Sequence, residues 1–282
     1  MAATGVMALP ALNSGSGDMW PRIASAAVLA PLALAVAYAG SPAFEAALIA
    51  VAGLLAWEWT GLCGSRRGSL MYALLTLVAA AAVLFVAADE LGSAVTAVVA
   101  GTLIAVLLEG DDAEGQDRRA WMALGVVYIA VPLAALEGLR LAPHGRELVI
   151  WLLVVVWASD TVAYMFGRAF GGLKLAPSIS PKKTWSGLGG AVIGAAAAGG
   201  LIALALGADD AADFALMAAL FGLVGQGGDL MESAVKRRFG VKDTSRLIPG
   251  HGGLFDRLDA FLAVVVVAAA ARALGWTGGT TW

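Results

Sequence analysis

The stretch ELVIWLLVVVWASDTVAYMFG, residues 147–167, is apolar over most of its length and carries Asp160 near its end. A helix that crosses a bilayer needs about 20 mostly apolar residues. A strand of a membrane barrel instead alternates polar and apolar side chains, and this stretch does not. Because lipid offers the backbone no hydrogen-bond partner, a spanning segment is a helix or part of a closed barrel. The stretch therefore predicts a membrane-spanning α-helix.

Similar apolar runs fill most of the chain. The 282 residues are 60% hydrophobic and 14% charged, whereas globular proteins carry about 25% charged residues. We expect an all-α polytopic integral membrane protein with about nine transmembrane helices. Besides 147–167, the runs cover residues 22–40, 43–63, 70–88, 91–108, 120–139, 187–206, 211–228 and 257–275.

The ends of the chain differ from this transmembrane domain, which we place at residues 22–275. Residues 1–21 are small and polar and predict a disordered tail, and residues 276–282 form a short C-terminal tail. Ala37-Tyr38-Ala39 resembles a signal-peptide cleavage site. However, the first apolar run exceeds the typical 7–15 residues of a signal peptide and follows 21 other residues. We expect this run to be retained as a membrane anchor.

Basic residues fall mainly on one side of the predicted bundle. With residue 1 in the cytoplasm, fifteen lysines and arginines face the cytoplasm, and Arg140, Arg146 and Arg272 face the other side. Cytoplasmic loops of membrane proteins carry an excess of basic residues. We therefore expect the two most polar segments, 168–186 and 229–257, to lie in the cytoplasm.

Other features exclude some classes of site. Cys63 is the only cysteine, and only two histidines occur, so neither a cysteine cluster nor a histidine metal site is expected. The net charge of −3 predicts no nucleic-acid partner. Gly190 and Gly194 form a GxxxG pair that is typical of close helix packing. Glu58 lies between Trp57 and Trp59, which we assign to the interfacial aromatic belt, although Glu58 could line a site.

The first polar segment combines an intramembrane carboxylate with a basic turn. A carboxylate such as Asp160 is costly in a spanning helix, and such residues usually face a polar cavity. Two prolines make helix unlikely through 176–181, which leaves an ordered turn before the next helix. Backbone N–H groups at a helix start bind anions. We expect an anion there, bound also by Ser180, Lys182, Lys183 and Thr184.

The second polar segment brings carboxylates, bases and glycines together. If residues 229–238 are helical, Asp229, Ser233, Lys236 and Arg237 share one face. The glycines at 250, 252 and 253 let the backbone approach a ligand closely. Magnesium is usually bound by one or two carboxylates plus substrate phosphates, and Asp229 and Asp256 at helix ends fit that pattern. A network of ion pairs alone is the structural alternative.

These residues resemble the phosphatidate cytidylyltransferase (CDP-diacylglycerol synthase) family. The C-terminal signature of that family is matched at Ser233, Lys236, Arg237, Lys242, Asp243, Pro249, His251, Gly252, Gly253, Asp256, Arg257 and Asp259. A second block is matched at Ser159–Tyr164, Gly167, Arg168, Lys174, Leu175 and Ser180–Thr184. One position departs: many relatives carry glutamate where this chain has Ser186.

The resemblance implies an enzyme with a cytoplasm-facing active site in a bacterial-type plasma (inner) membrane. It implies transfer of CMP from CTP to phosphatidic acid, which gives CDP-diacylglycerol and pyrophosphate, with Mg²⁺ and room for a second, monovalent or divalent cation. The implied metal ligands are Asp229, Asp256 and Asp259, and the implied catalytic residues are Asp229, Lys236, Asp256 and Arg257. The implied substrate-binding residues are Asp160, Ser180, Lys182, Lys183, Thr184, Ser233, Arg237, Lys242, Asp243, His251, Gly252 and Gly253.

Two other functions fit parts of the pattern. A transporter for a phosphorylated metabolite would also carry an intramembrane aspartate, but its charges should lie near the bilayer midplane, whereas these cluster at helix ends. A relative acting on another lipid acceptor, such as an isoprenoid phosphate or an ether lipid, stays open. Helix faces rich in small residues also allow a homodimer within the membrane lipids.

Overall fold

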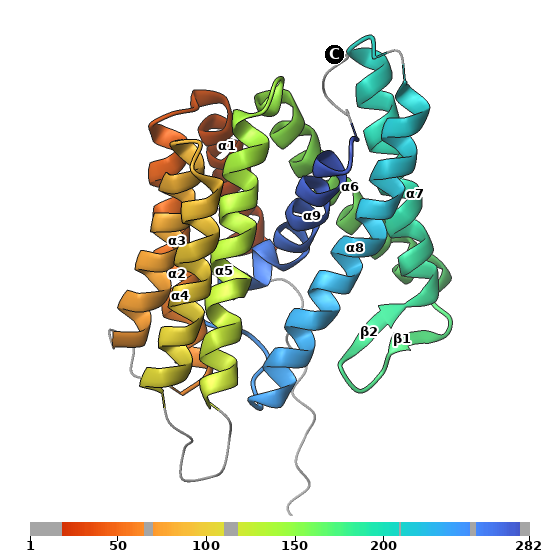
Figure 1. The fold of residues 1–282 in the computed structure, drawn as a ribbon. Coiled ribbons are helices and arrows are strands. Elements are labelled where there is room, and N and C mark those ends of the chain that lie inside the picture. The colour runs from red at the N-terminus through yellow and green to blue at the C-terminus, as the bar shows by residue number, and fades with distance from the viewer. Residues whose placement is uncertain (1–18, 65–69, 110–117, 209, 249–251, 277–282) are drawn as a thin grey trace, which may run out of the picture.

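The computed structural model describes residues 19–64, 70–109, 118–208, 210–248 and 252–276. This part of the chain forms nine helices and one short antiparallel hairpin, drawn in Figure 1. The helices are α1 (Met19–Ala39), α2 (Ala43–Leu62), α3 (Leu70–Ala87), α4 (Leu91–Leu108), α5 (Arg118–Leu141), α6 (Gly145–Phe170), α7 (Trp185–Ala205), α8 (Ala211–Arg238) and α9 (Phe255–Ala273). The strands are β1 (Lys174–Ala176) and β2 (Ser180–Thr184).

Seven of these helices, α2 to α8, are long and apolar enough to cross a membrane. The prediction of a polytopic helical membrane protein is therefore confirmed. α1 is apolar over Ser25–Ala39, which is shorter than a full span. α9 has 19 residues and carries Asp256, Arg257, Asp259 and Arg272. The predicted total of nine spans stays a prediction for these two helices.

The helices form two groups that meet at α9. In Figure 1, α1 to α5 stand together on the left, and α7 and α8 form the right side with α6 behind. α7 packs against both α6 and α8, and α5 packs against α2, α3 and α4. α9 packs against α5, α6 and α8 and so joins the two groups. Side chains at the start of α9 are therefore positioned by both groups of helices.

An aromatic stack fixes the start of α9 against the N-terminal group. Trp59, Tyr128 of α5 and Phe255 form a triangle of aromatic rings, with centroids 5.2 to 5.6 Å apart. Trp59 is buried and donates a hydrogen bond to the Trp121 carbonyl at 2.9 Å. Gly125 leaves room for this ring, because a Cβ there would lie 2.3 Å from Trp59 Nε1. The assignment of Trp59 to the interfacial belt was therefore wrong: its ring fills the core.

The predicted GxxxG packing is confirmed, and it lies within the chain. A Cβ on Gly190 would lie 2.7 Å from the side chain of Phe166, and one on Gly194 would lie 2.6 Å from Val162. Both neighbours belong to α6. The small-residue face of α7 is therefore occupied by α6.

The segment before α7 is a two-stranded hairpin where the sequence predicted an ordered turn. Lys174 is opposite Thr184, and Ala176 is opposite Ser180, with an irregularity between these pairs. Pro177 lies between the strands and Pro181 lies in β2. A proline lacks the N–H that a central strand would need, but β2 has only one neighbouring strand. The prolines thus exclude helix, as predicted, without excluding a short strand.

Candidate active site

Polar side chains from α8, α9 and β2 meet at the end of α8 that carries its basic last turn. The helix continues through 229–238, as the sequence predicted. Lys183 of β2 places its Nζ 2.7 Å from Asp229 Oδ2 and 3.3 Å from the Gln226 carbonyl oxygen. Gln226 in turn donates from Nε2 to Asp160 Oδ1 at 3.3 Å. The structure therefore brings together the intramembrane aspartate and the lysine that the sequence assigned to substrate.

Lys236 joins α8 to α9. Its amine lies 2.5 Å from Glu232 Oε2, one helical turn earlier, and 2.6 Å from Asp256 Oδ1 on α9. All three side chains are at least nine-tenths buried. Breaking a buried ion pair on one side leaves an uncompensated charge, which is strongly destabilising. These contacts therefore fix the distance between the two helices at the site.

Three carboxylates lie close enough to share one cation. One oxygen each of Asp229, Glu232 and Asp259 lies within 4.8 Å of the other two. Glu232 Oε1 is buried, and no hydrogen bond to it occurs within the described ranges. Asp259 Oδ1 accepts the Ala260 N–H at 2.8 Å, and no ion pair to Asp259 is formed by the described side chains. These are hard oxygen ligands of the kind that Mg²⁺ prefers.

The charge balance of the cluster also fits a divalent cation. Asp229, Glu232, Asp256 and Asp259 supply four negative charges when ionised, and the two lysines that contact them, Lys183 and Lys236, supply two positive charges. The remaining charge is −2. Buried carboxylates need compensation by pairing or by a metal. The carboxylates of the cluster therefore outnumber the lysines that contact them, and a divalent cation would offset this excess of negative charge.

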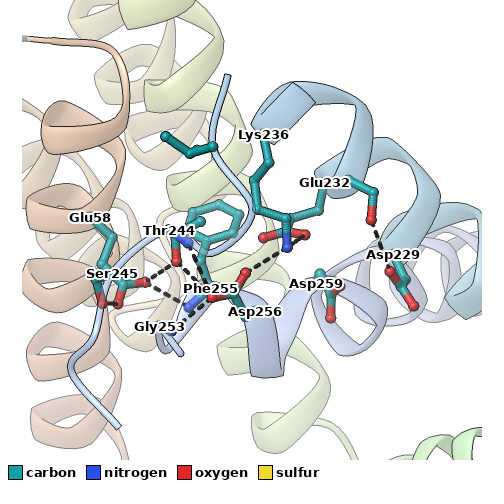
Figure 2. A network of polar contacts seen from close by, with 12 residues as sticks. Glu58, Asp229, Glu232, Lys236, Thr244, Ser245, Gly253, Phe255, Asp256 and Asp259 are labelled. Atoms are coloured by element: carbon teal, nitrogen blue, oxygen red, sulfur yellow. Dashed lines mark hydrogen bonds and ion pairs between the residues drawn. The ribbon is translucent and has the colours of Figure 1, made fainter. Parts of the chain in front are cut away.

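Asp256 differs from the other two aspartates that the sequence grouped as metal ligands. Its Oδ1 contacts Lys236, and its Oδ2 accepts the backbone N–H groups of Gly253 at 2.7 Å and Thr244 at 3.1 Å. Figure 2 shows these contacts beside the Asp229–Glu232–Asp259 group. Both of its oxygens are thus occupied by donors within the protein. Among the described residues, Asp259 has no such set of donors, although both aspartates lie in the first turns of α9.

The hairpin places the remaining residues of the first predicted site in different surroundings. Thr184 is buried, and its Oγ1 accepts the Gly187 N–H at 3.1 Å, so its hydroxyl caps α7. Ser186, where many relatives carry glutamate, donates to the Gly171 carbonyl. Ser180 is half-buried and Lys182 is exposed. Of the four predicted anion ligands on this segment, Lys183 is the one that reaches the carboxylates of α8.

The residues that follow α8 are mostly exposed. Arg237 donates to the Ile179 carbonyl at 3.2 Å and to the Val241 carbonyl at 2.9 Å, which ties the hairpin to the end of α8. Lys242, Asp243 and Arg257 are exposed, and Ser233 donates to Asp229 Oδ1 at 3.4 Å. His251 lies outside the described residues.

The glycines of this segment serve the protein itself. Gly252 has φ +85°, a conformation that L side chains rarely adopt. A Cβ on Gly253 would lie 2.0 Å from Thr244 Oγ1 and 2.6 Å from Glu58 Oε1. The sequence predicted that these glycines let the backbone approach a ligand. Among the described residues, Gly253 instead lets the backbone approach the side chains of Thr244 and Glu58.

Sequence reasoning missed Gln226 and Glu232 as members of the site. Glu232 lies one turn after Asp229 and one turn before Lys236, so helical spacing alone could have placed it on their face. Gln226 is a polar amide within the apolar run 211–228, and that was the signal available in the sequence. The contacts of Thr244 and Ser245 with Glu58 join segments far apart in the chain, and no spacing indicates them.

Comparison with known proteins places the chain among enzymes. Residues 20–274 match the model of the cytidylyltransferase family. A phosphatidate cytidylyltransferase of Pseudomonas aeruginosa is 41% identical over 273 residues, covering 90% of this chain and 97% of the relative. One of Brucella abortus is 36% identical over 255 residues, covering 89% and 92%. One of Rickettsia felis is 34% identical over 158 residues, covering 52% and 68%.

Proposed function

This chain belongs to the cytidylyltransferase family, and we propose that it transfers CMP from CTP to phosphatidic acid, producing CDP-diacylglycerol and pyrophosphate. One structural observation supports this most directly. A cluster of carboxylates from α8 and α9 meets Lys236 of α8 and Lys183 of the hairpin at one site of a polytopic membrane protein. Such a site suits one polyanionic soluble substrate and one phosphorylated lipid.

We assign a Mg²⁺ ion to Asp229, Glu232 and Asp259, whose oxygens lie within 4.8 Å of one another. When bound, this ion would neutralise charge on the triphosphate oxygens. Asp256 supports the site differently: it contacts Lys236 and receives the backbone N–H of Gly253, so it orients the lysine and the start of α9. The second cation that the family resemblance allows has no separate ligand set within the described ranges.

The reaction needs charge neutralisation more than a base. The phosphatidate monoester has a second pKa of about 6, so near neutral pH it is largely a dianion. One of its oxygens attacks the α-phosphorus of CTP and forms the new P–O bond. The bond from the α-phosphorus to the oxygen bridging to the β-phosphorus breaks, its electron pair stays on that oxygen, and pyrophosphate leaves. The chain must therefore hold two polyanions together.

Cations from three elements meet this demand. Lys182 and Lys183 are on β2, Arg237 and Lys242 are at and after the end of α8, and Arg257 is on the first turn of α9. Charge-assisted hydrogen bonds from such groups to phosphate are stronger than neutral ones. Preorganised donors of this kind supply much of the rate enhancement in other phosphoryl-transfer enzymes.

We place this site on the cytoplasmic side of a bacterial inner membrane. The fifteen-to-three distribution of basic residues supports this orientation, and CTP is a cytoplasmic substrate in this proposal. Bacterial relatives and seven candidate spans support a multi-pass protein of the cell membrane.

A transfer assay with purified protein tests the proposed function. CTP labelled at its α-phosphorus is supplied with magnesium and one lipid phosphate at a time: phosphatidic acid, an ether-linked analogue or an isoprenoid phosphate. We expect label in CDP-diacylglycerol and one pyrophosphate released per lipid consumed. Label that appears only with another lipid, or that stays in CTP with every lipid, would contradict the proposal.

A further inference from the structure

Glu58 is a fully buried carboxylate near the end of α2 and 0% exposed. Burying a carboxylate is costly unless hydrogen bonds or opposite charge compensate it. Its Oε1 accepts the Ser245 hydroxyl at 2.6 Å and the Leu254 N–H at 2.8 Å. Its Oε2 accepts the Phe255 N–H at 2.7 Å and lies 3.3 Å from Thr244 Oγ1. All four donors thus belong to residues 244–245 and 254–255, which are 186 to 197 residues away in sequence.

Two of these donors are the N–H groups at the start of α9. Leu254, the capping residue of α9, makes no side-chain capping hydrogen bond. The first N–H groups of a helix have no partner within the helix, and the positive end of the helix dipole favours an anion there. Glu58 therefore caps α9 from another helix, and the described residues place no basic side chain in an ion pair with it.

The same carboxylate connects to the active site through one hydroxyl. Thr244 Oγ1 lies between Glu58 Oε2 and Asp256 Oδ2, which is 3.2 Å away. Asp256 contacts Lys236, and Lys236 contacts Glu232 of the carboxylate cluster. Figure 2 shows this series running from Glu58 on one side to Glu232 and Asp229 on the other.

We propose that Glu58 is a positioning residue for the transfer reaction: it holds Thr244, Ser245 and the start of α9 so that Asp256 and Asp259 face α8 at the right distance. This inference rests on the proposed roles of these two aspartates. The requirement for glycine at 253 agrees with it, since a Cβ there would lie 2.6 Å from Glu58 Oε1. The N-terminal helix group thus takes part in the site, although the two polar segments lie in the C-terminal half.

Glu58→Gln tests the role, because an amide nitrogen cannot accept the N–H that one carboxylate oxygen now accepts. We expect faster hydrogen exchange at Leu254 and Phe255 in protein without substrates. We also expect turnover to fall, and the magnesium and CTP concentrations for half-maximal rate to rise. Loss of a supporting partner outside the ligand set typically costs about 10–100-fold in metal affinity or activity.

Glu45→Gln is the matched control, because Glu45 is also buried on α2 but in its first turn, at the opposite end. It should leave the exchange of residues 254 and 255 and both half-saturation values unchanged. If Glu58→Gln prevents folding, Thr244→Val removes only the shared hydroxyl. Thr60→Val is its control, because the buried Thr60 hydroxyl donates within α2, to the Ala56 and Trp57 carbonyls.

The inference would be overturned if Glu58→Gln left the hydrogen exchange and both half-saturation concentrations unchanged, even with a lower melting temperature. If that variant does not fold, unchanged half-saturation concentrations in Thr244→Val would overturn it. Failure of the proposed function looks different. In that case the wild-type protein makes no CDP-diacylglycerol, while exchange at Leu254 and Phe255, which needs no substrate, still reports on Glu58.

Discussion

At the scale of single residues, aspartates with the same apparent role have different partners. Asp256 is held by an ammonium group and two backbone N–H groups. Asp229 shares one lysine and one serine, and Asp259 accepts one N–H. Sequence spacing could not separate them, because all three lie in polar stretches that also carry basic residues. The donors that occupy Asp256 come from the loop before α9, and a chain's spacing does not show how a loop folds back.

Asp256→Asn should therefore lower the stability of the fold as well as affect the site. It leaves Lys236 with Glu232 alone and weakens the acceptor for Gly253 and Thr244. Removing one partner of a buried ion pair costs about 3–5 kcal/mol, so we expect a lower melting temperature in detergent. Asp213→Asn, on the exposed first turn of α8, is the control. A melting temperature equal to wild type would show that the Asp256 contacts do not stabilise the fold.

At the scale of elements, the lengths of the apolar runs and the small-residue pair predicted the helices well. The apolar runs match the nine observed helices closely, and the GxxxG pair marks the contact of α7 with α6. The hairpin was missed, because KLA is only three residues long and SPKKT has no alternation of polar and apolar residues, so neither shows a strand pattern. Its strands exist through pairing with each other and contact with α8, and such tertiary contacts override local preference.

Adjacent glycines of α7 give a direct test of this packing. Gly190→Ala would place a methyl group 2.7 Å from Phe166, whereas Gly189→Ala meets no atom within 4 Å. Overpacking typically costs about 1–3 kcal/mol. We expect Gly190→Ala to lower the melting temperature in detergent and Gly189→Ala to leave it unchanged or raise it. Equal melting temperatures for the two variants would mean that α6 and α7 are not packed this closely.

At the scale of the whole molecule, sequence predicted the membrane class and the polar end of the bundle, but not how two groups of helices share one site. The join depends on the contacts of the neighbouring residues Glu58 and Trp59 with Phe255, which is 197 residues after Glu58 and meets them only in the folded chain. The orientation in the membrane depends on the distribution of basic residues. It can be tested without removing the native cysteine.

One cysteine introduced near either end of α8 tests the orientation. Arg246→Cys follows α8 on the site side and Ala212→Cys is at its opposite end, and both positions are exposed. Background should be low, because Cys63 is buried and burial raises the pKa of its thiol to about 12. A membrane-impermeant maleimide added to spheroplasts should label position 212 and not position 246. The reverse pattern would contradict a cytoplasmic site.

The magnesium dependence of CMP transfer tests the central claim, that carboxylates of α8 and α9 form the metal site of a cytidylyltransferase. Asp229→Asn and Asp259→Asn each remove one anionic ligand, and Asp213→Asn makes the same change on α8 away from the site. Losing one preorganised electrostatic contact elsewhere costs about 10²–10³ in rate. We expect both site variants to lose at least that much and to need more magnesium, with Asp213→Asn like wild type. Normal turnover and an unshifted magnesium curve in both site variants would contradict the account.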